Sequence, residues 1–339
     1  MRKGQILTLL GIGLVAGGVA TAVAVLPTWL PVQASREAGR IDFTIWFTIV
    51  ISIVIFAIVA AVMIYEIAKF RAPPGDDSDG PPIHGHTGLE IGWTIVPLVI
   101  VTSIAIVSAI VLSRNGNAGV NPLRIDVTAQ QYSWSFTYPD AHGLTSAVLR
   151  LPKNRSVMLT ISSKDVIHSF WVPEFGQKQD AVPGLHTTLH ITPDRIGTYP
   201  VICVELCGLG HSVMRSEAIV MTPAAFDQWL KSQQAAIASP NASVSGAAVF
   251  KNNGCAACHT LTAAGATGKI GPDLDKLTQW AAQAKQPLAS FVKTSITDPN
   301  AYIQPGFPKS VMPPTFGSTL SAQQLDALVQ YLISSSKKG

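Results

Sequence analysis

Two cysteines, a histidine and a methionine lie close together near the middle of the chain. They follow the pattern Cys-x3-Cys-x3-His-x2-Met, as Cys203, Cys207, His211 and Met214. Thiolate, imidazole and thioether groups are ligands that copper prefers. An electron-transfer site with one copper ion needs only one cysteine. The second thiolate therefore predicts two copper ions, bridged by the sulfurs of Cys203 and Cys207.

Two further ligands complete this predicted copper pair. The backbone carbonyl of Glu205, which lies between the cysteines, can bind one ion. The missing imidazole is assigned to His168, in the stretch Val-Ile-His-Ser-Phe-Trp-Val-Pro. A disulfide between Cys203 and Cys207 is the alternative. So short a loop gains little stability from cross-linking, and a disulfide would leave His211 unexplained.

With both stretches taken together, the chain resembles subunit II of the haem–copper cytochrome oxidases, whose dinuclear copper centre is called CuA. The resemblance implies a cupredoxin sandwich over residues 120–222. It also implies that the Glu205 carboxylate reaches a magnesium ion shared with the catalytic subunit. Tyr132 and Trp134 lie in an aromatic stretch that serves the family as the electron entry point. The position of Tyr132 is usually tryptophan in the family.

A second metal motif, Cys255-Ala256-Ala257-Cys258-His259, is the attachment signature of c-type haem. Cys255 and Cys258 would form thioethers, and His259 would bind the iron. A zinc half-site is the alternative, but no Cys or His follows His259 to complete it. Met312, the sole methionine after His259, is the predicted second axial ligand. Its position and the segment 271–274 resemble class I cytochromes c.

The polar two thirds of the chain read as two modules. Short β-rich runs separated by turn residues, among them 146–151, extend from 121 to 221 and predict a sandwich or barrel. Helical patterns dominate 246–339, the predicted cytochrome c domain. Residues 223–245 are assigned to a helix end and a linker, with a flexible tether from Ser232 onwards because Ser, Ala, Gln and Asn dominate there.

The first third of the chain is predicted to lie in a membrane. Only 13% of all residues are charged, and mean hydropathy is +0.32. Two uncharged runs predict a helical hairpin over 35–116, with spans at about 43–65 and 91–113. Residues 1–34 are either a signal peptide cleaved after Ala34 or a retained membrane anchor. Positive charge between the spans favours a cytoplasmic loop, so the metal modules lie on the outer side.

Glu90, at the start of the second span, lies in a Glu-x2-Trp-Thr-x2-Pro stretch. By the same resemblance, it lies at the mouth of a proton-conducting channel of the catalytic subunit. A solvated carboxylate at a helix N-terminus, where the helix dipole favours it, is the alternative.

These observations predict a multidomain membrane protein: a transmembrane hairpin, an all-β cupredoxin domain and an all-α cytochrome c domain. The expected function is that of the electron-input subunit of a respiratory cytochrome c oxidase in a bacterial inner membrane, where the partner reduces oxygen to water and pumps protons. The implied partners are oxidase subunits I and III, membrane lipid and an external one-electron donor such as cytochrome c. A net charge of +4 gives no reason to expect nucleic acid.

Three alternative functions remain at this stage. A CuA-containing nitric oxide reductase subunit would share these motifs, because the partner decides which gas is reduced. A membrane-anchored copper carrier would not need the haem domain. A quinol oxidase subunit shares the fold but usually lacks the copper ligands.

Overall fold

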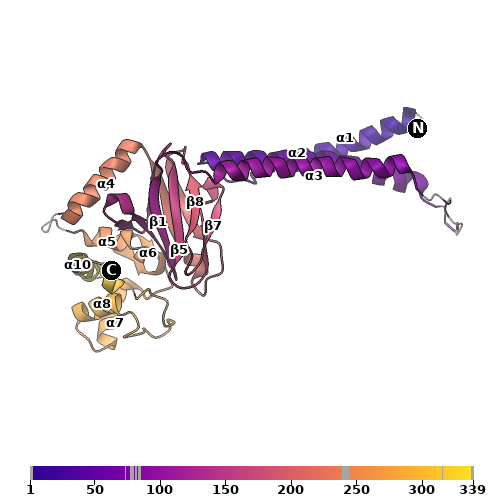
Figure 1. The fold of residues 1–339 in the computed structure, drawn as a ribbon. Coiled ribbons are helices and arrows are strands. Elements are labelled where there is room, and N and C mark those ends of the chain that lie inside the picture. Colours follow the sequence, from indigo (N-terminus) through magenta and orange to yellow (C-terminus); the bar gives the residue numbers. More distant parts are fainter. Residues whose placement is uncertain are drawn as a thin grey trace. The chain divides into compact units, whose positions relative to one another are not determined.

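The computed structural model describes residues 3–72, 74–76, 80, 82, 85–238, 244–314 and 316–336 (Figure 1). The chain divides into two compact units. The first comprises Met1–Val32 and Gly39–Asn115, and the second comprises Gln33–Ala38 and Gly116–Gly339. Membrane-type helices, a β-sandwich and a helical C-terminal module occur in this order along the chain, as predicted.

The first unit consists of long apolar helices. They are α1 (Lys3–Val25), α2 (Arg36–Phe70) and α3 (Thr87–Asn115), and each is long and apolar enough to cross a membrane. The two predicted spans lie inside α2 and α3. A Cβ atom added to Gly17 of α1 would lie 3.3 Å from the Cβ of Ala57 in α2, so these two helices pack through small residues.

The short segment Gln33–Ala38 belongs to the second unit, where it pairs with loops of the sandwich. The backbone N–H of Ala34 donates to the Glu174 carbonyl at 2.8 Å, and Ala34 is fully buried. The N–H of Thr192 donates to the Glu37 carboxylate at 2.7 Å. The predicted cleavage position after Ala34 therefore lies in buried, hydrogen-bonded backbone.

Two five-stranded sheets form the sandwich, in the orders β3-β2-β1-β5-β8 and β4-β10-β9-β6-β7 (Figure 1). Pairs β1–β5 and β4–β10 are parallel, and the other pairs are antiparallel. The strands are β1 (Leu123–Gln130), β2 (Ser133–Tyr138), β3 (Leu144–Ser146), β4 (Leu149–Pro152), β5 (Val157–Ser163), β6 (His168–Trp171), β7 (Lys178–Ala181), β8 (Thr187–Ile191), β9 (Gly197–Cys203) and β10 (Arg215–Met221).

Alternation of buried and exposed side chains gives the sandwich its core. Every second residue of β1, starting at Leu123, is buried, as expected for a strand with one face inward. The sequence predicted one strand over 146–151. This prediction is wrong, because the segment contains the end of β3 and most of β4. The Ser146 hydroxyl bonds both the N–H and the carbonyl of Val148, at 3.1 and 2.9 Å, and so turns the chain between them.

Helix α4 (Pro223–Ala238) follows the sandwich and is longer than predicted. The tether was expected to begin at Ser232, but its Ala and Gln residues are good helix formers and continue the helix to Ala238. Phe226 and Trp229 pack their rings on Tyr138, with centroids 6.2 and 5.2 Å away. Residues 239–243 of the predicted linker lie outside the described part of the chain.

The C-terminal module is a small helical domain with its own core. Its first helix crosses its last closely, because a Cβ on Gly246 would meet Ala327 and Tyr331. The hydroxyl of Ser321 and the side chain of Gln324 cap the last helix reciprocally, as predicted. The helices are α5 (Gly246–Asn252), α6 (Cys255–Cys258), α7 (Leu277–Gln283), α8 (Leu288–Thr297), α9 (Phe316–Thr319) and α10 (Ala322–Ser336); a short ladder pairs β11 (Thr260–Leu261) with β12 (Ala266–Thr267).

Candidate metal centres

Two neighbouring strands bring the predicted copper ligands together. His168 is the first residue of β6 and Cys203 is the last residue of β9. These strands pair antiparallel, with Phe170 opposite Cys203. The loop after Cys203 returns to the same point, where the Cys203 N–H donates to the carbonyl of Met214 at 3.2 Å. Ligands from distant parts of the sequence thus meet at one end of the sandwich.

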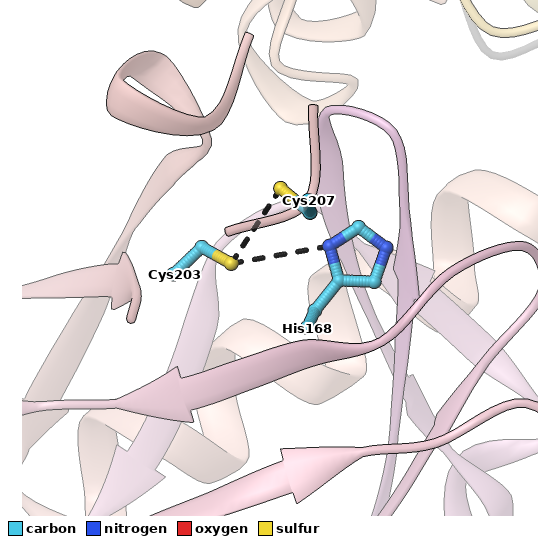
Figure 2. Close-up of side chains that lie close together, drawn as sticks. All are labelled: His168, Cys203 and Cys207. Carbon is cyan, nitrogen blue, oxygen red and sulfur yellow. Dashed lines mark hydrogen bonds between the residues drawn. The ribbon is translucent and has the colours of Figure 1, made fainter. Parts of the chain in front are cut away.

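The donor atoms of these residues surround one small space. Figure 2 shows the side chains of Cys203, Cys207 and His168 pointing toward one another. The two sulfurs are 3.8 Å apart, and the Cys203 sulfur lies 3.9 Å from Nδ1 of His168. Cys203, Cys207 and His168 are buried. The remaining donors lie nearby: Cys207 Sγ is 3.5 Å from His211 Nδ1 and 3.8 Å from Met214 Sδ, and Cys203 Sγ is 3.3 Å from the Glu205 carbonyl.

The two thiols have very different affinities for protons. Burial raises the pKa of Cys203, but hydrogen bonds from His168 and from the backbone at Ser169 and Glu205 outweigh burial and lower this pKa to about 6. Burial and the neighbouring Cys203 charge raise the pKa of Cys207 to about 12. Negative charge on one sulfur therefore opposes loss of the proton from the other.

The donor set fits copper. Two free thiols, two imidazoles, a thioether and a carbonyl face one space, and soft sulfur with imidazole nitrogen suits copper rather than magnesium or calcium. The residues named from the sequence for this centre, His168, Cys203, Glu205, Cys207, His211 and Met214, are thus brought together.

Asp165 supports this cluster and was missed in the sequence. Its carboxylate accepts a hydrogen bond from Nε2 of His168 at 2.8 Å. Burial raises the pKa of Asp165, but the backbone N–H of Gln131, His168 and the N–H of Val166 outweigh it, so the group stays a carboxylate. A carboxylate three positions before a histidine is a weak sequence signal, and only the turn at 163–166 brings it back onto the ring.

The C-terminal module gathers the predicted haem ligands around one cavity. Cys255, Cys258, His259 and Met312 all line it, together with mainly apolar side chains. Nδ1 of His259 lies 2.8 Å from the Pro272 carbonyl, which leaves Nε2 available to a metal. Burial lowers the pKa of His259 and keeps the imidazole neutral, as metal ligation requires.

The cavity fits a covalently bound haem. Its walls are mainly apolar, both cysteines of the attachment motif line it, and an imidazole and a thioether can provide the two axial ligands. Gly271 packs so closely on the His259 ring that a Cβ there would collide with Cε1. The segment at 271–272 therefore holds the imidazole in place from one side.

The two predicted entry residues occupy different positions. Trp134 is 2% exposed and packs edge-on against Phe170, with centroids 5.5 Å apart, so it lies within the core. Tyr132 is half-buried and, with Ser133, lines the same cavity as the haem-type ligands. The N–H of Ala147, in the sandwich, also donates to the carbonyl of Asn252, at the end of α5, at 2.7 Å. Of the two aromatic residues, Tyr132 is the one next to the C-terminal module.

Two other predicted site residues have exposed side chains. Glu205 contributes its carbonyl to the cluster while its carboxylate is exposed. Glu90 lies in the first turn of α3 and accepts a hydrogen bond from the N–H of His86 at 3.2 Å. This contact is the one expected of a carboxylate at a helix N-terminus.

Three family models match the chain, one in the region of helices α2 and α3, one in the sandwich and one in the C-terminal module. The transmembrane domain of cytochrome c oxidase subunit II matches residues 25–111, and the periplasmic domain of that subunit matches 144–222. The cytochrome c family matches residues 243–336.

Two similar proteins carry the description cytochrome c oxidase subunit 2, and a third is a quinol oxidase subunit. Cytochrome c oxidase subunit 2 of Thermostichus vulcanus is 34% identical over 235 residues, which span 53% of this chain and 70% of the relative. Its counterpart in Alkalihalophilus pseudofirmus is 27% identical over 80% of both chains. Quinol oxidase subunit 2 of Bacillus subtilis is 28% identical over 50% of this chain and 54% of that relative.

Proposed function

The chain belongs to the cytochrome c oxidase subunit II family, and we propose that it is the electron-input subunit of a respiratory oxidase that reduces oxygen to water. In this proposal the chain takes single electrons from an external donor through its C-terminal module. It then delivers them through the loop from Cys203 to Met214 to the catalytic subunit. The reduction of oxygen and the pumping of protons take place in that partner.

The observation that carries this proposal is the meeting of six donor groups at one end of the sandwich. We assign two copper ions to them, bridged by Cys203 and Cys207, with terminal ligands from the other four residues. This full set of donors favours a cytochrome c oxidase over a quinol oxidase. When bound, the copper pair and the haem supply one-electron oxidation and reduction.

The C-terminal module supplies the donor side. We assign the thioether bonds to Cys255 and Cys258, and the axial positions to His259 and Met312. A methionine–histidine pair raises the reduction potential of haem iron and suits it to electron transfer. Since the module is part of the same chain, it stays near the copper loop at high effective concentration. Tyr132, which lines the module's cavity, is the proposed point of electron entry into the sandwich.

The proposal extends to partners and location. The chain is a partner of oxidase subunit I. We propose subunit III and an external electron donor, such as cytochrome c, as further partners. We place the complex in a bacterial inner membrane, with the metal modules on the outer side. The exposed Glu205 carboxylate is proposed to share a magnesium ion with subunit I. For Glu90, the proposed role is at the mouth of a proton channel in the partner.

Metal analysis of the intact purified complex tests this function. We expect two copper ions for each copy of this chain in addition to the copper of the catalytic subunit, one haem c for each copy, and oxygen uptake with reduced cytochrome c. Replacing either Cys203 or Cys207 with serine should abolish the absorption of the copper pair while leaving haem c in place. In assembled wild-type material, one copper ion or none beyond the copper of the catalytic subunit would contradict the proposal, as would a disulfide between the two cysteines.

A further inference from the structure

A two-residue turn connects the copper loop to the surface that faces the C-terminal module. Strand β1 ends at Gln130 and β2 begins at Ser133, so Gln131 and Tyr132 form the turn. The Gln131 side chain donates from Nε2 to the carbonyl of Cys207 at 2.6 Å. The same nitrogen lies 3.4 Å from the Tyr132 hydroxyl. One amide therefore contacts both the proposed electron entry residue and a proposed copper ligand.

The backbone of Gln131 makes a second connection to the copper cluster. Its N–H donates to one carboxylate oxygen of Asp165 at 2.7 Å, and the other oxygen of Asp165 accepts from His168 at 2.8 Å. Gln131 is thus linked to two proposed ligands. Its side chain contacts Cys207 directly, and its backbone N–H is connected to His168 through Asp165.

The Tyr132 ring lies directly on the glycines of the copper loop. A Cβ on Gly208 would lie 2.5 Å from the Tyr132 hydroxyl and 2.8 Å from Nε2 of Gln131. A Cβ on Gly210 would lie 2.5 Å from Cδ2 of the same ring. Gly208 also has φ +123°, a conformation that other residues rarely adopt. Turn and loop are therefore in close contact, without intervening side chains.

We propose that Gln131 is a positioning residue, which holds the Tyr132 ring against the Cys207–Gly210 segment and so fixes the electron path from the C-terminal module into the copper centre. This inference rests on the proposed function. The amide can do this because it donates to the Cys207 carbonyl, which otherwise has to find another partner in a half-buried site. A carboxylate at position 131 would have the same shape but no N–H to donate.

The electronic consequence follows from distance. Electron transfer between two groups slows steeply when a gap opens between the atoms that connect them. Hydrogen bonds and direct contacts keep this gap closed. Groups that hydrogen-bond to the ligands of a metal change the properties of the metal centre without binding the metal themselves. If the Gln131 bond is lost, the ring and the loop separate for part of the time while the copper ligands themselves are unchanged.

The test uses the intact oxidase complex with Gln131→Glu and Gln131→Ala. Gln130→Glu is the matched control, because Gln130 is the last residue of β1 and alternates with the buried Ala129, so its side chain points away from the core. Copper content and the copper absorption spectrum are measured first. The haem c is then reduced by a light pulse in the presence of a photoreductant, and the arrival of the electron at copper is followed by transient absorption. Hydrogen exchange of the 203–214 peptide reports on the loop in the same samples.

We expect both Gln131 variants to retain copper and to bind haem c normally. Electron arrival at copper should slow by up to about fivefold, because losing one hydrogen bond lowers the ratio of closed to open contact between ring and loop by about that factor. Hydrogen exchange in 203–214 should become faster, and Gln130→Glu should match the wild type in both measurements.

Two outcomes would overturn the inference. The first is an unchanged transfer rate in both Gln131 variants with copper intact. The second is loss of copper from both variants, which would make Gln131 a structural support of the metal site rather than a positioning residue for transfer. Failure of the proposed function has a separate signature, because the wild type itself would then show no electron arrival at copper after reduction of haem c.

Discussion

The carboxylate of Asp165 accepts a hydrogen bond from Nε2 of His168 at 2.8 Å. This bond fixes which ring nitrogen carries the proton, and Nδ1 is left facing the sulfur of Cys203 at 3.9 Å. Asp165 in turn is held by the N–H of Gln131 at 2.7 Å and by that of Val166 at the same distance. The orientation of the imidazole therefore depends on a residue outside the proposed set of ligands.

Replacing Asp165 with alanine should weaken copper binding. The imidazole loses the partner that orients it and that raises its basicity as a ligand, and such changes typically reduce metal affinity about 10–100-fold. The affinity can be measured by competition with a copper chelator, in the purified complex. Asp140→Ala is the control, because Asp140 pairs with Arg124 on the exposed surface. Equal copper affinity in both variants would show that Asp165 does not support the centre.

The sequence named residues that the fold gathers into one cluster, but not the groups that orient them. Cys203, Cys207, His211 and Met214 stand at a fixed spacing, which carries the chemistry within one loop. The place of His168 beside this loop does not follow from spacing along the chain, because it depends on the pairing of β6 with β9. Asp165 and Gln131 lie in turns, and their contacts depend on how those turns fold back against the loop, which spacing along the chain does not determine.

Element types were predicted better than element ends. The tether expected from Ser232 is helical up to Ala238, because helix propensity and the packing of Trp229 on Tyr138 continue α4. The run at 146–151 has the composition of one strand, but the hydroxyl of Ser146 bonds to Val148 and divides it. Both errors come from local contacts that a pattern of apolar residues does not contain.

Replacing Gly210 with alanine should displace the Tyr132 ring. The added Cβ would lie 2.5 Å from Cδ2 of the ring, while φ at Gly210 is −91°, which alanine tolerates. The expected cost is therefore steric, about 1–3 kcal/mol of overpacking. It can be measured as a lower midpoint for thermal loss of the copper absorption.

The origin of that cost can be checked with a double-mutant cycle. In a Tyr132→Ala background the ring is absent, and the alanine at position 210 should then be nearly neutral. An equal loss in both backgrounds would mean that Gly210 is required for a reason other than contact with Tyr132.

Replacing Met312 with leucine should lower the reduction potential of haem c. Leucine keeps nearly the same volume in the cavity but removes the sulfur that, in the proposed ligation with His259, raises the potential of the iron. The potential is measured by redox titration of the intact complex. Met158→Leu, in strand β5 of the sandwich, is the control and should leave the potential unchanged. The same potential in the Met312 variant and the wild type would exclude Met312 as the axial ligand.

Replacing Tyr138 with phenylalanine should destabilise the sandwich although no metal ligand is changed. The Tyr138 hydroxyl donates to the Arg150 carbonyl at 3.0 Å and accepts from the Arg150 N–H at 2.7 Å. Burial raises the pKa of Tyr138, so the neutral phenol keeps both bonds at physiological pH. Without the hydroxyl, both backbone groups of Arg150 lose this partner, at a cost of about 1–3 kcal/mol.

Tyr199→Phe removes a single hydrogen bond, to the Arg195 carbonyl at 2.9 Å, and should cost less. Thermal unfolding of the two variants measures both losses of stability. If Tyr138→Phe lost no more stability than Tyr199→Phe, the pair of hydrogen bonds to Arg150 would not stabilise the sandwich.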